Sequence, residues 1–169
     1  MLRGNKGHQD LIAAVRPMMI DRPRLHVVIA AERGEFDKLK STIDGLGLAH
    51  RIHLLGFRKD INNVLRGCDL FVLPTHQEAL GQAFIEAMAM SLPVIGTHVD
   101  GVPELIEPEV NGFTGATTRH RRTVRRAHAP DRRRSIARAL RTGRAYQNRQ
   151  QFHGREHGRR DCRFISTWH

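Results

Sequence analysis

Two glutamates and a glycine within THQEALGQAFIEAMAMSLPVIGTHVDGVPELI have the types and the spacing to bind a polar ligand that carries both hydroxyl groups and a phosphate. Glu78 and Glu86 are separated by seven residues, and Gly81 lies between them, where a helix over residues 82–90 is expected to begin. A helix start exposes unpaired backbone N–H groups and carries about half a positive charge, so it receives a phosphate well. Glycine lets such a ligand approach the backbone closely.

The two carboxylates could accept hydrogen bonds from the hydroxyl groups of a sugar and of a ribose, each worth roughly 1.5 to 3 kcal/mol. The alternative is that Glu78 is solvated and that Glu86 merely faces water on an amphipathic helix, as isolated glutamates usually do. The preceding buried strand, the glycine and the following EAMAMSLPVIGT favour a binding site. A ligand with a sugar at one end, phosphates in the middle and a ribose at the other would use all of these features.

The elements that position these residues are alternating helices and strands. Hydrophobic periodicity predicts helices over residues 7–20, 35–48, 59–68 and 82–90, strands over 25–31, 51–57, 69–74 and 92–97, and a helical turn over 101–106. The strands are nearly continuous in apolar residues, which is typical of a parallel sheet covered by helices on both faces. We therefore expect a doubly wound, Rossmann-like α/β domain over residues 1–116. Such folds bind ligands beyond the carboxyl ends of their strands, where PTHQE, GF and GTHVDG fall.

Residues 117–169 differ in composition from the rest of the chain, which carries 28 Lys and Arg against 17 Asp and Glu in total. They hold sixteen arginines, no lysine and three acidic residues, whereas residues 1–116 hold 12 basic and 14 acidic residues. We expect this Arg-rich tail to be irregular or disordered. Two explanations stay open. One is a pair of frameshifts near residues 116 and 152, because arginine codons of a GC-rich gene read one base later encode Ala, Gly, Val, Asp or Glu. The other is a genuine basic tail that binds polyanions.

Composition excludes several classes of protein. No apolar run approaches the roughly 18 residues needed to span a bilayer, and MLRGNKGHQD lacks the apolar core of a secretory signal, so we expect a cytoplasmic location. Cys68 and Cys162 are too few and too far apart for a disulfide scaffold, and neither sits in a metal-ligand pair. We assign no catalytic role to His8 in the first helical turn or to His76 and His98 in loops, because a lone histidine there is more often a surface residue.

The stretch from residue 69 to 115 resembles the carboxyl-terminal, donor-binding domain of GT-B glycosyltransferases of family GT4, the large retaining group. The family pattern is a Pro-Ser/Thr pair, a Glu, Phe-Gly, a second Glu in EAMA, a small-residue turn, PV and a G…E segment. This chain supplies, in that order, Pro74, Thr75, Glu78, Gly81, Glu86, Pro93, Gly101 and Glu104. The resemblance extends from residue 1 to about residue 115. Because a strand would normally precede MLRGNKGH, we expect the first strand and the acceptor-binding domain to be absent from this chain.

The resemblance implies roles for residues around the predicted helix. Glu78 and the adjacent backbone amides of Leu80, Gly81 and Gln82 would hold the donor sugar and its diphosphate. Glu86 would hold the ribose.

The resemblance also implies cations and a place for the base. In RGNKGH, Lys6 matches a lysine that neutralises the donor diphosphate, and Arg3 would replace the usual arginine, whose position is occupied by Met1. The alternative is that RGNKGH is a solvated loop whose cations bind no ligand. The nucleobase would lie near LLGF, so Gly56 and Phe57 are candidates, although an aromatic residue after a strand is more often part of the core.

The implied function is that of a glycosyltransferase fragment. It would bind a nucleotide diphosphate sugar such as a UDP-, GDP- or ADP-sugar, with no cofactor and no metal. In the full-length enzyme, cytoplasmic or peripheral at the inner membrane face, the hexosyl unit would pass with retention to an acceptor glycan or lipid-linked sugar. The isolated chain would bind donor without transferring it. Two alternatives stay open: a GT-B-like nucleotide-sugar epimerase or hydrolase, and a basic nucleic-acid-binding protein that acts through the tail.

Overall fold

The computed structural model describes residues 6–30, 33–116 and 162–167. The helices within them are α1 (His8–Asp21), α2 (Arg33–Gly45), α3 (Ile61–Arg66), α4 (Gln82–Ala89) and α5 (Val102–Leu105). The strands are β1 (Leu25–Ala30), β2 (Ile52–Leu54), β3 (Leu70–Leu73), β4 (Val94–Thr97), β5 (Gly112–Gly115) and β6 (Cys162–Thr167). Every element predicted between residues 7 and 106 is therefore confirmed, with small differences at its ends.

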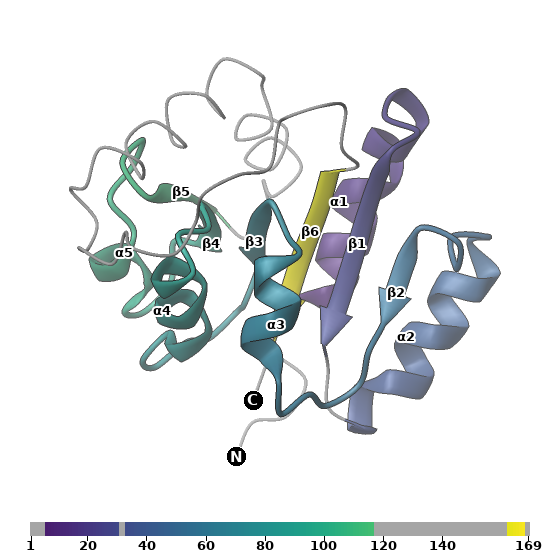
Figure 1. The fold of residues 1–169 in the computed structure, drawn as a ribbon, viewed down its shortest axis with the longest axis horizontal. Coiled ribbons are helices and arrows are strands. Elements are labelled where there is room, and N and C mark those ends of the chain that lie inside the picture. The colour runs from purple at the N-terminus through teal and green to yellow at the C-terminus, as the bar shows by residue number, and fades with distance from the viewer. Residues whose placement is uncertain (1–5, 31–32, 117–161, 168–169) are drawn as a thin grey trace.

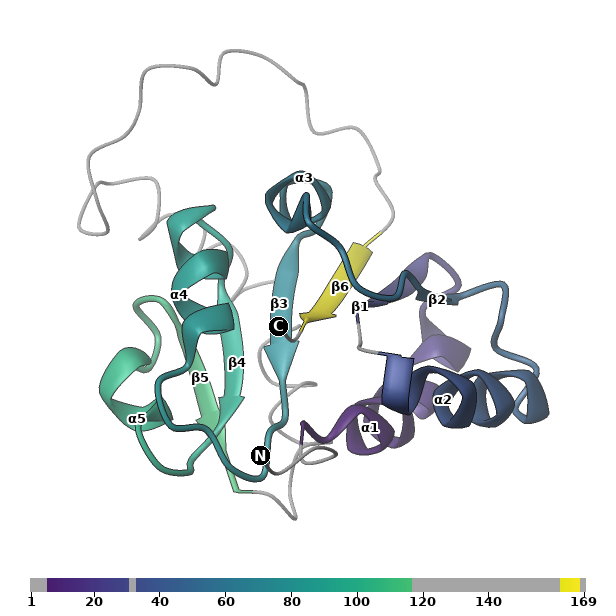
Figure 2. The same cartoon turned by 90° about the horizontal axis from the view of Figure 1, so that it is seen from below.

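The strands form one parallel sheet in the order β2-β1-β6-β3-β4-β5. Helices cover both faces: α1 and α2 lie on one side, and α3 and α4 lie on the other (Figures 1 and 2). The expected doubly wound α/β fold is confirmed. Parallel neighbours need such crossover helices, because a tight hairpin can join only antiparallel strands.

The strand β3 shows why an uninterrupted apolar run belongs in this sheet. Leu70 and Val72 join the core cluster that includes α1 and α2, whereas Phe71 and Leu73 join the cluster that includes α3 and α4. All four residues are buried. Phe71 also makes an edge-to-face contact with Phe84 of α4, with ring centroids 5.4 Å apart. Because both faces of the strand are covered, no position in it favours a polar residue.

The strand β2 is shorter than the predicted segment 51–57, because the chain turns out of the sheet after Leu54. Gly56 adopts a φ of 65°, a left-handed conformation that does not continue a strand. Gly56 and Phe57 therefore lie beyond the carboxyl end of β2, at the edge of the sheet where ligands are expected.

The strand β6, like β5, was not expected from the sequence. It lies in the middle of the sheet (Figure 1), paired with β1 from Leu25 opposite Cys162 to Ala30 opposite Thr167. It also pairs with β3, through Phe164 and Ile165. The expectation of an irregular tail was therefore wrong for residues 162–167, because a segment between two strands pairs its backbone on both sides whatever the composition of the chain before it. The rest of the Arg-rich tail, residues 117–161 and 168–169, lies outside the described residues.

Candidate functional site

The loops that follow β3 and β4 are joined at the carboxyl edge of the sheet. After β3, Thr75 is buried and its hydroxyl donates a 2.7 Å hydrogen bond to the carbonyl oxygen of Gln77. This bond tightens the turn that leads to Glu78. The backbone N–H of Glu78 donates to Oδ2 of Asp100, which follows β4, over 2.8 Å. The backbone around Glu78 is thus held from two neighbouring strand ends.

The side chains of Lys6 and Glu78 meet at this edge. Lys6 Nζ donates a 2.8 Å hydrogen bond to Glu78 Oε2, and the two side chains are only 16% and 12% exposed. The other carboxylate oxygen, Oε1, accepts the backbone N–H of Gly81 over 3.1 Å, at the start of α4. The carboxylate therefore lies between an ammonium group and the positive end of a helix, two features that favour an anion.

Gly7 and Gly81 shape the two chain segments that meet here. Each adopts a φ of 68° immediately before a helix, α1 and α4 respectively. A Cβ atom on Gly81 would stand 2.5 Å from Cδ1 of Leu105, a residue of α5. A side chain at Gly81 would therefore strain the backbone and require the Leu105 side chain to shift.

Glu86 lies further along α4, where the amide of Gln82 donates a 3.4 Å hydrogen bond to its Oε1. Like Glu78, Glu86 is neither fully buried nor fully exposed. Leu80, which directly precedes Gly81, is 69% exposed. The start of α4 thus presents two carboxylates, an amide side chain and an apolar side chain.

Phe57 is 57% exposed, so the alternative that it belongs to the core is wrong. An exposed aromatic ring at this edge offers a flat apolar face on which a planar base could stack. The next residue, Arg58, donates two hydrogen bonds of 2.8 Å to the carboxylate of Asp60. These bonds from Arg58 hold the pKa of Asp60 below its ordinary value.

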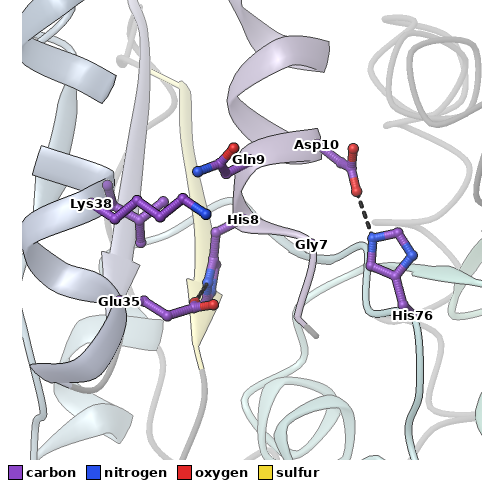
Figure 3. Close-up of a pocket in the computed structure, with 8 residues that line it drawn as sticks. Gly7, His8, Gln9, Asp10, Glu35, Lys38 and His76 are labelled. Carbon is purple, nitrogen blue, oxygen red and sulfur yellow. Dashed lines mark hydrogen bonds and ion pairs between the residues drawn. The ribbon is translucent and has the colours of Figure 1, made fainter. Parts of the chain in front are cut away.

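A pocket of about 270 Å³ lies between the starts of α1 and α2, with Gly7 in its wall (Figure 3). It is lined by Gly7, His8, Gln9, Asp10, Glu35, Lys38, Leu39 and His76. His8 Nδ1 and Glu35 Oε2 are 2.9 Å apart, and the His8 side chain is only 1% exposed. This hydrogen bond lowers the pKa of Glu35, the charges of His8 and Lys38 act in the same direction, and burial opposes them.

The structure corrects the expectation for His8, which does not lie on the surface of the first helical turn. It is buried because α1 packs beside α2, and its Nε2 has no hydrogen-bond partner among the described residues. His76 behaves as expected: it is exposed and its Nε2 lies 2.7 Å from Oδ2 of Asp10. His98 is also exposed, with Nδ1 3.3 Å from the hydroxyl of Thr114.

The predicted site residues are brought together in part. Glu78 contacts both Lys6 and Gly81, and Gln82 and Glu86 follow on α4. Gly56 and Phe57 lie on a separate loop, after β2, and Arg3 lies outside the described residues.

Sequence reasoning missed two contacts in this region. Asp100 was not singled out, although the Asp-Gly pair it begins is a turn signal and its φ of 44° marks a constrained position. The His8–Glu35 pair joins residues 27 apart in the chain, and no local pattern reveals such a contact.

In the part of the chain that the structure covers, no group of three or more His, Cys, Asp and Glu residues could hold a metal ion. In the same part, every helix is too short or too polar to traverse a bilayer.

Residues 1–126 match the family described as Glycosyl transferases group 1, and the chain belongs to this family. Its fold agrees with the family assignment. The C-terminal domain of LpcC, a group 1 glycosyl transferase of Francisella tularensis, is 25% identical with a TM-score of 0.69, over 87% of this chain and 83% of that domain. The chain therefore corresponds to the carboxyl-terminal domain of a GT-B glycosyltransferase.

Two further comparisons concern longer proteins. The HepE protein of Anabaena, solved in complex with UDP-glucose, is 26% identical with a TM-score of 0.66, over 82% of this chain and 40% of that protein. An uncharacterised glycosyltransferase of Methanocaldococcus jannaschii is 34% identical over 110 residues, which are 64% of this chain and 28% of that protein. The chain thus spans well under half of the length of these relatives.

Proposed function

We propose that this chain is the donor-binding part of a retaining GT4-type glycosyltransferase, which binds a nucleotide diphosphate sugar and, with an acceptor-binding domain, transfers its hexosyl unit. The observation that carries the proposal is the meeting of Lys6, Glu78 and the start of α4 at the carboxyl edge of a doubly wound sheet. The complex of HepE with UDP-glucose supports a nucleotide sugar as the ligand class, since that protein shares this fold.

In this proposal the diphosphate is bound by the Lys6 ammonium and by the backbone amides that lead into α4, those of Leu80, Gly81 and Gln82. The bond that breaks in the reaction joins the anomeric carbon of the sugar to a diphosphate oxygen, so negative charge grows on the leaving diphosphate. A fixed ammonium group and a helix start stabilise that charge without a cofactor or metal. Arg3 would add a second cation.

The remaining residues would hold the two ends of the donor. The Glu78 carboxylate would accept hydrogen bonds from hydroxyl groups of the hexosyl unit, and Glu86 would accept them from the ribose. The base would lie against Gly56 and the exposed ring of Phe57. The acceptor, a glycan or a lipid-linked sugar, would bind outside this domain.

A titration of the chain with UDP-, GDP- and ADP-glucose by isothermal calorimetry tests the proposal. One nucleotide should bind, and Lys6→Ala should weaken it about ten- to a hundred-fold, because one charge-assisted hydrogen bond is worth roughly 1.5 to 3 kcal/mol. The matched control is Lys40→Ala, which removes an equal charge from the exposed Lys40–Asp44 pair of α2 and should leave the affinity unchanged. No binding of any nucleotide sugar, or equal effects of the two variants, would refute the proposal.

Retention is tested separately, with the acceptor-binding domain supplied on the same polypeptide. The anomeric proton of the product, followed by NMR before it can equilibrate, should show the configuration of the donor. An inverted product would remove the retaining part of the proposal and leave donor binding intact.

A further inference from the structure

Glu78 already occupies the groups that the proposed function gives to the diphosphate. Its Oε2 accepts the Lys6 ammonium at 2.8 Å, and its Oε1 accepts the Gly81 N–H at 3.1 Å. With only 16% of the Lys6 side chain and 12% of the Glu78 side chain exposed, these contacts are partly shielded from water. The carboxylate is therefore in the position of an internal anion.

A diphosphate that joins this arrangement meets the negative charge of Glu78. A phosphate oxygen that reached Lys6 while Glu78 stayed in place would bring two negative charges within about 4 Å in a partly buried site, which is strongly unfavourable. The repulsion therefore favours the withdrawal of Glu78 from Lys6 when a diphosphate binds. A shielded carboxylate that loses its ammonium partner needs other donors, because leaving it unsatisfied is costly.

We infer that Glu78 makes this site selective for an intact nucleotide sugar over the nucleotide diphosphate that remains after transfer. The inference rests on the proposed function and adds a competition to it. The hydroxyl groups of a hexosyl unit can donate hydrogen bonds to the displaced carboxylate and so replace Lys6. A nucleotide diphosphate offers no hydroxyl group at that end. Glu78 then returns to Lys6, competes with the diphosphate and promotes its release.

The Glu78→Gln variant tests the competition. Glutamine keeps an oxygen that can accept the Gly81 N–H, but it removes the charge that competes with phosphate for Lys6. Inorganic pyrophosphate and the nucleotide diphosphate should bind on the order of ten-fold more tightly to this variant than to the unmodified chain. The nucleotide sugar should gain less or become weaker, so the preference for the sugar conjugate should fall. Isothermal calorimetry at constant ionic strength measures all three affinities.

Two further variants make the result decisive. Asp44→Asn removes one negative charge from the exposed Lys40–Asp44 pair, at the far end of α2, and should change no affinity. Glu78→Asp keeps the charge on a side chain too short to hold both Lys6 and Gly81 as glutamate does. It should give a smaller gain in pyrophosphate affinity, and it serves as the test if the glutamine variant does not fold.

The outcomes separate this inference from the proposed function. Unchanged or weaker pyrophosphate binding by Glu78→Gln overturns the competition, even where the unmodified chain binds a nucleotide sugar. An equal gain for Asp44→Asn overturns it as well, because the effect would then be one of overall charge. Tighter pyrophosphate binding by Glu78→Gln, in a chain that binds no nucleotide sugar, upholds the competition and refutes the proposed function.

Discussion

The carbonyl oxygen of Pro74 lies only 1.9 Å from the position that a Cβ atom on Gly7 would occupy. The start of α1 is thus packed directly on the end of β3, with no space for a side chain between them. Lys6 precedes Gly7, and Glu78 lies in the loop that Pro74 begins. This backbone contact therefore brings together the two segments that carry the ammonium and the carboxylate.

Gly7→Ala should destabilise the chain by about 2 to 4 kcal/mol, because the variant combines left-handed strain with overpacking against a backbone oxygen. Chemical denaturation measures this loss. Gly47→Ala is the matched control: Gly47 has a φ of 67° but nothing within 4 Å of its Cβ position, so it should cost only about 1 kcal/mol. Equal losses in the two variants would show that the Pro74 contact has no energetic weight.

Ile165→Pro should strongly destabilise the sheet, by about 3 kcal/mol or more, because proline removes a backbone donor from a central strand. Ile165 lies in β6 opposite both Val28 of β1 and Phe71 of β3. Ile165→Val keeps the backbone donor and a β-branched side chain, so it should have little effect. Thermal unfolding followed by circular dichroism compares the two. A proline variant as stable as the valine variant would place β6 outside the sheet in solution.

Glu35→Gln should lower the free energy of unfolding near pH 7 by roughly 0.5 to 1 kcal/mol, because Glu35 is only partly buried. The hydrogen bond from His8 lowers the pKa of Glu35 in the folded state, so its contribution is present above the ordinary glutamate pKa. It is lost as the pH falls through the lowered pKa. The difference in stability between the two chains should therefore close in acid.

Denaturation midpoints measured from neutral to acid pH give this comparison. Glu107→Gln, at an exposed position, controls for the loss of one charge. A gap between Glu35→Gln and the unmodified chain that widens in acid would contradict the assigned sign.

Phe57→Ala should weaken the bound nucleotide about five- to a hundred-fold and leave inorganic pyrophosphate binding unchanged, because stacking on a base is worth roughly 1 to 3 kcal/mol. The fold should keep its stability, since Phe57 is 57% exposed. Ile20→Ala removes an even more exposed apolar side chain, 82% exposed on α1, and should affect neither ligand. Calorimetric titration of both variants decides whether the base lies at this loop.

Local patterns were sufficient for most of the fold. The apolar run of β3 predicts a strand covered on both faces, and the structure places Leu70 and Phe71 in separate core clusters. The start of α4 was likewise predicted from Gly81. The structure shows this residue in the left-handed conformation that glycine adopts readily. These features depend on residues close together in the chain, and periodicity and turn chemistry report on such residues.

Contacts between distant segments could not be derived in this way. The sequence could not tell whether Phe57 is exposed or buried, because an aromatic residue after a strand occurs in both environments. The structure shows that it is exposed. The burial of His8 depends on α2 lying beside α1, and its 2.9 Å contact with Glu35 crosses 27 positions of the chain. The position of β6 in the sheet depends on whether β1 and β3 leave backbone N–H and C=O groups with which it can pair.

The sequence by itself determined the order of helices and strands between residues 7 and 106, the doubly wound class of the sheet, and the residue types that gather where the strands end. Only the tertiary structure decided that Lys6 and Glu78 bind each other at 2.8 Å and that Cys162–Thr167 is a central strand. The physical reason is that secondary structure follows from neighbouring residues, whereas the partner of a charge or of a strand edge is set by segments that only folding brings together.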